Sequence, residues 1–359
     1  MPEIRRNAVT GEWVVMAPER ARRPQPLAAA RAAAPRPEHQ AGCPFCPGNE
    51  AATPDATLSL GEPWRVRAFP NRFSLLAPDA EPWRQEKGRH LAIGAVGPHE
   101  VFCETRRHDL TLARLSAGEV VDVVAAWHAR ATAFHADPRV AWVSVFKNHG
   151  AAAGASQEHA HSQIVGLPMV PAASAERAAR AERHHADTWR CLLCATLEDE
   201  LRDVARVVLE TQRFVSFIPW AALSPFHIWI FPRRHAADFT SATPDELADL
   251  GLHLHEVLRR IDLALQDPPF NLVIQSASPD RTGSPALHWY LSIVPRVTQA
   301  AGFELGTAMY VNTALPEECA RRLREAGAEP SPSPSPSDAD GAAPSRASGA
   351  APAASGGPG

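Results

Sequence analysis

The sequence predicts an α+β protein made of two tandem repeats, each an antiparallel sheet packed against a long helix. The first observation is that residues 99–135 and 226–262 share one pattern. Each segment has a short apolar strand, Arg-Arg-His, a Ser/Thr cap followed by Glu, and an amphipathic helix. The triplet Arg106–His108 recurs as Arg233–His235, 127 residues later. Self-similarity at this scale indicates duplicated structural units.

The second observation concerns the segment after each helix. Residues 140–146 and 270–274 are apolar and β-branched, and each run leads through a loop to a further strand that carries a histidine, His159 or His288. We therefore expect an N-terminal repeat over residues 1–172 and a C-terminal repeat over 173–327. Residues 328–359 are rich in Ser, Pro, Ala and Gly, which predicts a disordered tail.

Composition excludes several classes of protein. The 359 residues carry a formal net charge of -4, which argues against a nucleic-acid partner. No run of eighteen apolar residues predicts a membrane span, and the N-terminus lacks the apolar core of a signal peptide. We expect a cytoplasmic protein that binds neither nucleic acid nor membrane.

Four of the six cysteines form two Cys-x-x-Cys pairs, Cys43/Cys46 and Cys191/Cys194. In a chain without a secretory signal, such pairs indicate metal or redox sites before disulfides. Cys43 comes after a polar, Pro-rich loop rather than a buried strand, which favours metal over a thioredoxin-like site. Cys103 and Cys319 have no such partner, and we expect them to be ordinary buried thiols.

Each repeat offers the same ligand types in the same order, and two cysteines with two histidines form a closed tetrahedral zinc set. The sequence therefore predicts two structural zinc sites. Their ligands are Cys43, Cys46, His108 and His159 in the first repeat, and Cys191, Cys194, His235 and His288 in the second. Histidines that do not recur, among them His149 and His253, are expected on the surface or in packing.

His159 and His161 lie two residues apart, so both point to one face of a strand. With His159 on zinc, a free His161 imidazole is a good nucleophile towards phosphorus and can hold a nucleotidyl group as a phosphoramidate. Gln163, on the same face, can donate a hydrogen bond to phosphate but cannot deliver a proton, which favours a transferase over a hydrolase. Ser156 and its small-residue loop would supply further donors. The competing interpretation is a half-buried strand that happens to carry two histidines.

With these residues in place, the chain resembles the galactose-1-phosphate uridylyltransferase family of the histidine-triad superfamily over residues 3–325. The resemblance implies two histidine-triad-like half-barrels, His161 as the uridylylated nucleophile, Gln163 as its stabiliser, and zinc on the first ligand set. It also implies a homodimer and a role in galactose metabolism. The implied substrate-binding residues are Arg20, Arg23, Asn71, Asn148, Gly150 and Glu304.

The chain departs from the family pattern at several positions. Ala160 and Ser162 stand where the common motif has Pro and Gly, and the last strand lacks the paired histidines of an iron site. The second Cys-x-x-Cys and residues 302–307 instead resemble the branch that contains ADP-glucose phosphorylases.

Three enzymatic hypotheses and one non-enzymatic hypothesis remain at this point. The first is nucleotidyl transfer between UDP-glucose and a hexose 1-phosphate through a covalent nucleotidyl-histidine, with ping-pong kinetics. The second keeps that chemistry but transfers an adenylyl group from ADP-glucose to inorganic phosphate. The third is a nucleotide-sugar hydrolase, which Gln163 disfavours. The last is a zinc-stabilised binding module without catalytic activity.

Overall fold

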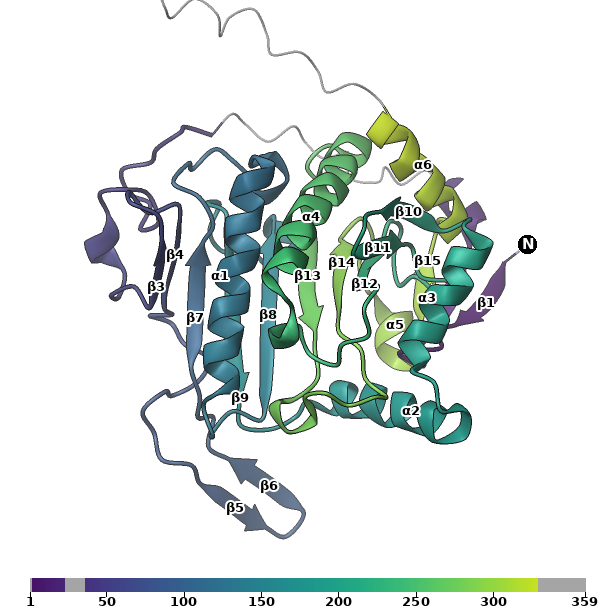
Figure 1. Ribbon diagram of the computed structural model, residues 1–359, viewed down its shortest axis with the longest axis horizontal. Coiled ribbons are helices and arrows are strands. Elements are labelled where there is room, and N and C mark those ends of the chain that lie inside the picture. Colours follow the sequence, from purple (N-terminus) through teal and green to yellow (C-terminus); the bar gives the residue numbers. More distant parts are fainter. Residues whose placement is uncertain (1, 23–35, 329–359) are drawn as a thin grey trace, which may run out of the picture. The chain divides into compact units, whose positions relative to one another are not determined.

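The core of the fold is one ten-stranded antiparallel sheet to which both halves of the chain contribute (Figure 1). The computed structural model describes residues 2–22 and 36–328. The strands of this sheet are β3 (Leu58–Leu60), β4 (Val66–Pro70), β7 (His99–Cys103), β8 (Trp142–His149), β9 (His161–Leu167), β10 (Val207–Glu210), β11 (Phe214–Phe217), β12 (Ile228–Pro232), β13 (Phe270–Gln275) and β14 (Tyr290–Pro295).

The strand order shows an internal repetition. From one edge to the other the order is β3-β4-β7-β9-β8-β13-β14-β12-β11-β10, so each half repeats the same order outward from the centre. At the centre, β8 and β13 pair antiparallel with Phe146 opposite Val273, two positions that are 127 residues apart. We expected two half-barrels; the structure instead joins both halves in one sheet, because β8 and β13 would otherwise leave unpaired edges.

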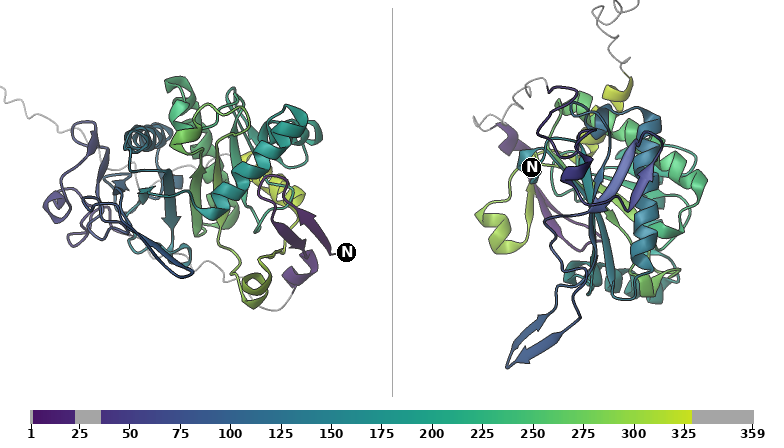
Figure 2. Two further views of the ribbon diagram at one scale, coloured as in Figure 1. Left: turned by 90° about the horizontal axis from the view of Figure 1, so that it is seen from below. Right: turned by 90° about the vertical axis from the view of Figure 1, so that its left-hand side faces the viewer.

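The two long helices of the sequence prediction are α1 (Ala117–His135) and α4 (Pro244–Leu265). Both helices begin with a capping box. The hydroxyl of Ser116 or Thr243 accepts a hydrogen bond from the backbone N–H of the Glu three residues later, and the carboxylate of that Glu accepts one from the backbone N–H of the Ser or Thr. The helices lie side by side across one face of the sheet (Figures 1 and 2). Gly251 of α4 lies so close to α1 that a Cβ there would be 2.6 Å from Cα of Val121.

Alternation along the strands divides the sheet into two faces. On β12, Ile228 and Ile230 belong to the core beneath α1 and α4, whereas Trp229 and Phe231 face a second core. This second core is closed by α2 (Ala172–Thr188) and α3 (Leu192–Asp203), which pack on the C-terminal half. The face of the N-terminal half opposite α1 instead carries the loop that contains Cys43 and Cys46.

The remaining elements lie outside the main sheet. Strands β1 (Glu3–Arg6), β2 (Trp13–Met16) and β15 (Tyr310–Asn312) form a three-stranded sheet. Strands β5 (Arg84–Lys87) and β6 (His90–Ile93) form a hairpin that projects from the body (Figure 2). The last helices are α5 (Gly302–Thr307) and α6 (Pro316–Ala328).

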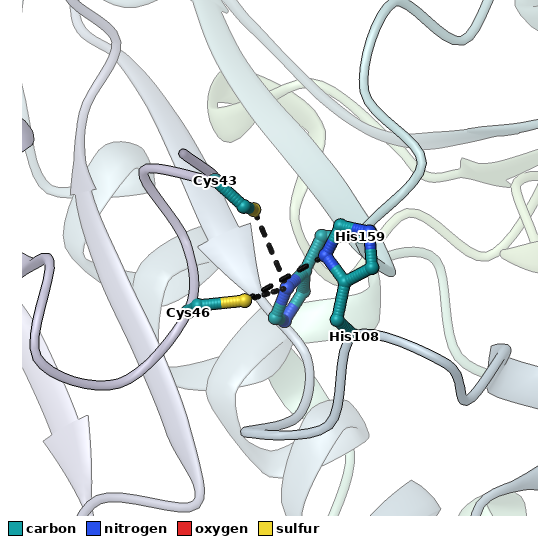
Figure 3. A group of neighbouring side chains, drawn as sticks. All are labelled: Cys43, Cys46, His108 and His159. Carbon is teal, nitrogen blue, oxygen red and sulfur yellow. Dashed lines mark hydrogen bonds between the residues drawn. The ribbon is translucent and has the colours of Figure 1, made fainter. Parts of the chain in front are cut away.

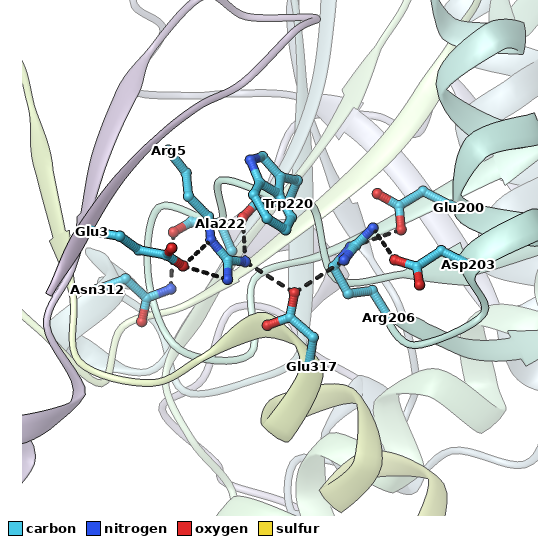
Figure 4. Close-up of polar contacts among 9 residues, drawn as sticks. All are labelled: Glu3, Arg5, Glu200, Asp203, Arg206, Trp220, Ala222, Asn312 and Glu317. Atoms are coloured by element: carbon cyan, nitrogen blue, oxygen red, sulfur yellow. Dashed lines mark hydrogen bonds and ion pairs between the residues drawn. The ribbon is translucent and has the colours of Figure 1, made fainter. Parts of the chain in front are cut away.

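A buried ionic network ties the first strand to the end of the described chain (Figure 4). One carboxylate oxygen of Glu317, on α6, accepts from Arg5 on β1 at 3.0 Å and from Arg206 at 3.0 Å. Arg206 also pairs with Glu200 of α3 at 2.9 Å. Arg5 and Arg206, from two distant segments, therefore converge on Glu317, which fixes the N-terminal strand against the C-terminal half.

The expected boundary at residue 172/173 falls at the first residue of α2, while Met1–Gly327 form one compact unit. The two halves are therefore subdivisions of one sheet. The tail expected to be disordered lies outside the described residues from 329 onward. Within the described ranges, no helix is both long enough and apolar enough to cross a membrane.

The close α1–α4 contact gives the first testable prediction. Gly→Ala in a helix interior ordinarily stabilises by about 0.5–1 kcal/mol. At Gly251 the new Cβ meets the backbone of Val121, so we expect Gly251→Ala to destabilise the protein by about 1–3 kcal/mol in urea unfolding. Gly118→Ala in α1 is the matched control, because nothing lies within 4 Å of its added Cβ. A Gly251→Ala protein more stable than the parent would contradict the packing described.

Candidate active site and metal centres

The first predicted metal cluster is assembled from three separate segments (Figure 3). Cys43 and Cys46 come from the loop before β3, His108 comes after β7, and His159 shortly precedes β9. All four side chains are buried, and their ligand atoms lie within 4.8 Å of one another. Nδ1 of His159 lies 3.7 Å from Sγ of Cys43 and 3.6 Å from Sγ of Cys46.

These distances fit a tetrahedral metal ion. Zinc bonds of ordinary length to sulfur and nitrogen place the two ligand atoms about 3.5 Å apart. The Nε2–H of His159 donates to the carbonyl of Thr105 at 2.8 Å, which leaves Nδ1 unprotonated and free to bind metal. Donor set, spacing and tautomer all fit zinc, which would clamp the loop before β3 onto the sheet.

The second cluster repeats this geometry in the C-terminal half. Sγ of Cys194 lies 3.4 Å from Nδ1 of His235 and 3.3 Å from Nδ1 of His288, with Cys191 completing the set. Nε2 of His288 donates to the carbonyl of Pro232, the residue that corresponds to Thr105 at the 127-residue offset. This Cys-x-x-Cys pair lies at the start of α3, as it does in thioredoxin-like redox motifs. The two histidines beside it complete four ligands, which favours a metal site.

His161 is the first residue of β9, and its imidazole is held in one tautomer. Its Nδ1 donates at 2.9 Å to the carbonyl of His159, which can only accept, so Nε2 carries the lone pair. Burial, reinforced by the nearby ammonium of Lys147, lowers the pKa of His161 and favours the neutral ring. The ring of Phe45, from the metal-binding loop, packs 5.6 Å from the His161 ring. The arrangement presents Nε2 as a nucleophile.

Gln163 comes next on the same face of β9 and is oriented by a histidine that the sequence analysis missed. The backbone N–H of Leu75 donates to Nδ1 of His99, so Nε2–H of His99 donates to Oε1 of Gln163 at 2.9 Å. Nδ2 of Asn71 lies 3.4 Å from the same oxygen. With Oε1 occupied, the amide nitrogen of Gln163 is left as the donor for a substrate oxygen.

Between His161 and Gln163, the side chain of Ser162 points to the opposite face. Its hydroxyl accepts from Nε1 of Trp127, on α1, at 2.7 Å. This contact explains why a serine stands where the family motif has glycine, and it anchors β9 to α1.

A cavity of about 140 Å³ opens beside His161. The predicted residues Ser156, Asn148 and Gly150 line it together with His161. Asn148 accepts at 2.8 Å from Asn271 of β13, which also donates to the carbonyl of Ala153. Gly150 has a φ of +78°, and a Cβ there would lie 2.8 Å from Pro269. Contacts from the C-terminal half thus stabilise the conformation of the loop around Gly150 in the N-terminal half.

The floor of this cavity contains a buried ion pair. Nζ of Lys147 donates to Glu104 at 2.6 Å and to the carbonyl of His161 at 2.9 Å. Both side chains are almost wholly inaccessible to solvent. Lys147 therefore fixes the backbone of the nucleophile on the side opposite its imidazole, a role for which the sequence offered no motif.

His149 corrects another expectation. We expected a surface or packing histidine, but it lines the cavity, and Nε2 lies 2.8 Å from Oδ1 of Asp267. The neighbouring imidazole holds the pKa of Asp267 below its usual range in spite of burial. Asp267 lies after α4, so this contact is another link between the halves. The buried thiols expected at Cys103 and Cys319 are confirmed.

Three predicted substrate-binding residues of the described ranges, Arg20, Asn71 and Glu304, do not line this cavity. Arg20 is exposed in a short 3₁₀ turn, Pro18–Arg22, and does not line it. Arg23 lies outside the described residues. Glu304 caps its own short helix by accepting from the backbone of Ala301 at 2.8 Å.

Comparison with known proteins agrees with this geometry. Residues 1–171 match the family described as galactose-1-phosphate uridyl transferase, N-terminal domain, and residues 115–328 match a domain of unknown function. ADP-glucose phosphorylase of Arabidopsis thaliana is 33% identical over 331 residues, covering 90% of this chain and 93% of that protein. Galactose-1-phosphate uridylyltransferase of Thermotoga maritima is 27% identical over 340 residues, covering 92% of this chain and 100% of that protein.

Solved structures show the same fold. The crystal structure of the Arabidopsis thaliana ADP-glucose phosphorylase with bound ADP-glucose superposes with a TM-score of 0.79 at 32% identity, covering 90% of this chain and 98% of that chain. A uridylyltransferase structure gives 0.71 at 26% identity, covering 91% and 98%. The fold and site define a nucleotidyltransferase. The chain belongs to the galactose-1-phosphate uridylyltransferase family, and its relatives include the ADP-glucose phosphorylase branch.

The metal clusters predict a defined zinc content. We expect one zinc ion for each cluster in the purified protein, and loss of one ion in either Cys46→Ser or Cys194→Ser, measured by elemental analysis. Both variants should melt at lower temperature, because metal binding is coupled to folding. Cys319→Ser, a buried thiol outside both clusters, should keep its full zinc content. A zinc-free parent protein, or a Cys46→Ser protein with unchanged content, would refute the assignment.

The buried ion pair predicts strong coupling in stability. Lys147→Met leaves the Glu104 carboxylate without its cation, and we expect a loss of about 3–5 kcal/mol in unfolding free energy. The double variant Lys147→Met/Glu104→Leu should recover most of that loss, because no charge remains buried. Additive single effects in this double-mutant cycle would argue against a coupled pair.

Proposed function

We propose that the protein is an ADP-glucose phosphorylase-type enzyme, which transfers an adenylyl group through a covalent intermediate on His161. The observation that carries the chemistry is the His161 tautomer, in which the proton on Nδ1 is held by His159 and Nε2 is bare. The observation that favours the adenylyl donor is the 33% identity to a named ADP-glucose phosphorylase, compared with 27% to a uridylyltransferase. The second Cys-x-x-Cys site agrees with that branch.

In the first step, Nε2 of His161 attacks the α-phosphorus of ADP-glucose. A P–N bond forms, the P–O bond to the bridging oxygen breaks, and glucose 1-phosphate leaves. The Nδ1 proton stays on the ring, where the carbonyl of His159 stabilises the positive charge that develops. The amide nitrogen of Gln163 would donate to a non-bridging oxygen of the phosphorus.

In the second step, an oxygen of inorganic phosphate attacks the same phosphorus. The P–N bond breaks, ADP leaves, and Nε2 regains its lone pair. Arg36 and His149 line the cavity, and the guanidinium of Arg36 suits an anionic acceptor. Neither step requires a proton donor, because glucose 1-phosphate leaves as a phosphate anion in the first step and the leaving group of the second step is the His161 imidazole, which keeps its Nδ1 proton.

The second candidate is uridylyl transfer between UDP-glucose and a hexose 1-phosphate, which the sequence analysis placed first. Matches to galactose-1-phosphate uridylyltransferases across 90% or more of the chain favour it. Glu304, the implied sugar contact, does not line the His161 cavity, which weakens the case for a hexose acceptor. Homodimerisation, the cytoplasmic location and the description of the halves as histidine-triad-like repeats stay predictions.

Zinc would stabilise the structure of the site and would take no direct part in the reaction. The first ligand set would hold it, and the ion would fix His159 and the loop that carries Phe45. The protein's own residues then orient His161 and hold the Nδ1 proton. This division explains why one strand needs two histidines with different tasks.

Intact-mass analysis tests the proposal directly. After mixing with ADP-glucose, we expect the protein mass to rise by one adenylyl group, and phosphate should remove that group with release of ADP. UDP-glucose should leave the mass unchanged. His161→Ala should give no adduct, whereas His90→Ala, an exposed histidine of the β5–β6 hairpin, should behave like the parent.

Two outcomes would change the assignment. A uridylyl adduct from UDP-glucose, discharged by a hexose 1-phosphate, would establish the second candidate instead. If neither nucleotide sugar modifies His161, the covalent mechanism is wrong for both candidates.

A further inference from the structure

The C-terminal half contains a cavity at the position that corresponds to the His161 cavity. Gln275, Ser276 and Ala277 line it, and these are the counterparts of Asn148, His149 and Gly150 at the 127-residue offset set by the β8–β13 pairing. His288 and Tyr290 also line it, and they occupy the places of His159 and His161 on the equivalent strand. The C-terminal half therefore has an equivalent cavity, but Tyr290 stands where the N-terminal half has His161.

The surroundings of the two cavities differ. In the C-terminal half, α2 covers the cavity and contributes Ala178 and Ala181 to its wall. Trp142, Leu193 and Leu287 add further apolar surface. The volume is about 150 Å³, and an apolar cavity of about this volume accommodates one benzene ring. The space thus suits a flat ring rather than a second phosphate loop.

One cation in this wall has only neutral partners. Arg177, on α2, donates to Ser174 at 3.0 Å and to Gln275 at 2.6 Å, and it forms no ion pair with a carboxylate of the described residues. Arg281, on the rim, is by contrast neutralised by Glu182 at 2.6 Å. A half-buried guanidinium that has no counter-ion and lines a cavity is suited to bind an anionic group.

We propose that this cavity is a second, non-catalytic binding site for a small molecule in which a flat ring carries an anionic group. The anion binds Arg177, and the ring lies among Trp142, Ala178, Leu193 and Tyr290. A nucleotide and a simple aromatic acid share this chemistry. Tyr290 also lines the cavity, and its phenol hydroxyl can donate a hydrogen bond to the same ligand.

Equilibrium dialysis with labelled AMP and, separately, labelled benzoate tests the site in the zinc-loaded full-length protein. AMP is also expected to bind at the His161 cavity, so the second site is defined by its response to substitution. Arg177→Met removes the charge-assisted hydrogen bond, and we expect at least about tenfold weaker binding at that site. Ala178→Phe fills the cavity and should abolish the site. Arg183→Met, on the same helix but outside the cavity wall, is the matched control and should bind as the parent does.

Zinc content and melting temperature identify folded variants; if Ala178→Phe does not fold, Arg177→Met decides alone. Loss of AMP binding in Arg177→Met identifies a nucleotide site, and loss of benzoate binding without an effect on AMP identifies a site for simple aromatic acids. Both outcomes support the proposal. It is overturned if neither ligand shows a class of sites sensitive to Arg177. It is also overturned if inorganic phosphate alone occupies that class as tightly as AMP does, because the ring would then contribute nothing.

Discussion

The proposed active site depends on three contacts made by one residue, His159. Its Nδ1 lies among the cysteines of the first metal cluster, its Nε2–H donates to Thr105, and its carbonyl accepts the Nδ1 proton of His161. The first two contacts fix the position of the ring and backbone, and the third selects the tautomer of the nucleophile. A zinc ion on this ligand set would therefore also influence the chemistry proposed for His161, two residues away.

The antiparallel pairing of β8 and β13 is the second constraint. It places the C-terminal half against the loop beside His161, where Asn271 supports Asn148 and Asp267 contacts His149. The C-terminal half lacks a nucleophile, but its removal would leave this loop without support. The equivalent histidines His99 and His227 show how far the duplication extends. Each accepts a backbone N–H on Nδ1, and the Nε2 atom of each lies 2.9 Å from a side-chain oxygen in the central part of β9 or β14.

Much of this arrangement could be predicted from the sequence, because the relevant residues are chemically distinctive and recur. Cys-x-x-Cys pairs and co-repeating histidines predicted both metal clusters, and the capping motifs predicted α1 and α4. Other contributions depend on pairings between distant segments, which no local pattern encodes. Lys147 looks like an ordinary strand residue until Glu104 lies against it, and Asn271 gains its role only when β13 pairs with β8. The single continuous sheet could not be predicted for the same reason, since each repeat shows only its own strands.

The central claim is that His161 presents a bare Nε2 because His159 holds its Nδ1 proton. Nitrogen-15 NMR of imidazole-labelled, zinc-loaded protein tests it most directly, since protonated and unprotonated ring nitrogens have well-separated shifts. The account predicts a neutral His161 protonated on Nδ1, with phosphorus coupling at Nε2 after a nucleotide sugar is added. A ring protonated on Nε2, or phosphorus attached to Nδ1, would contradict it.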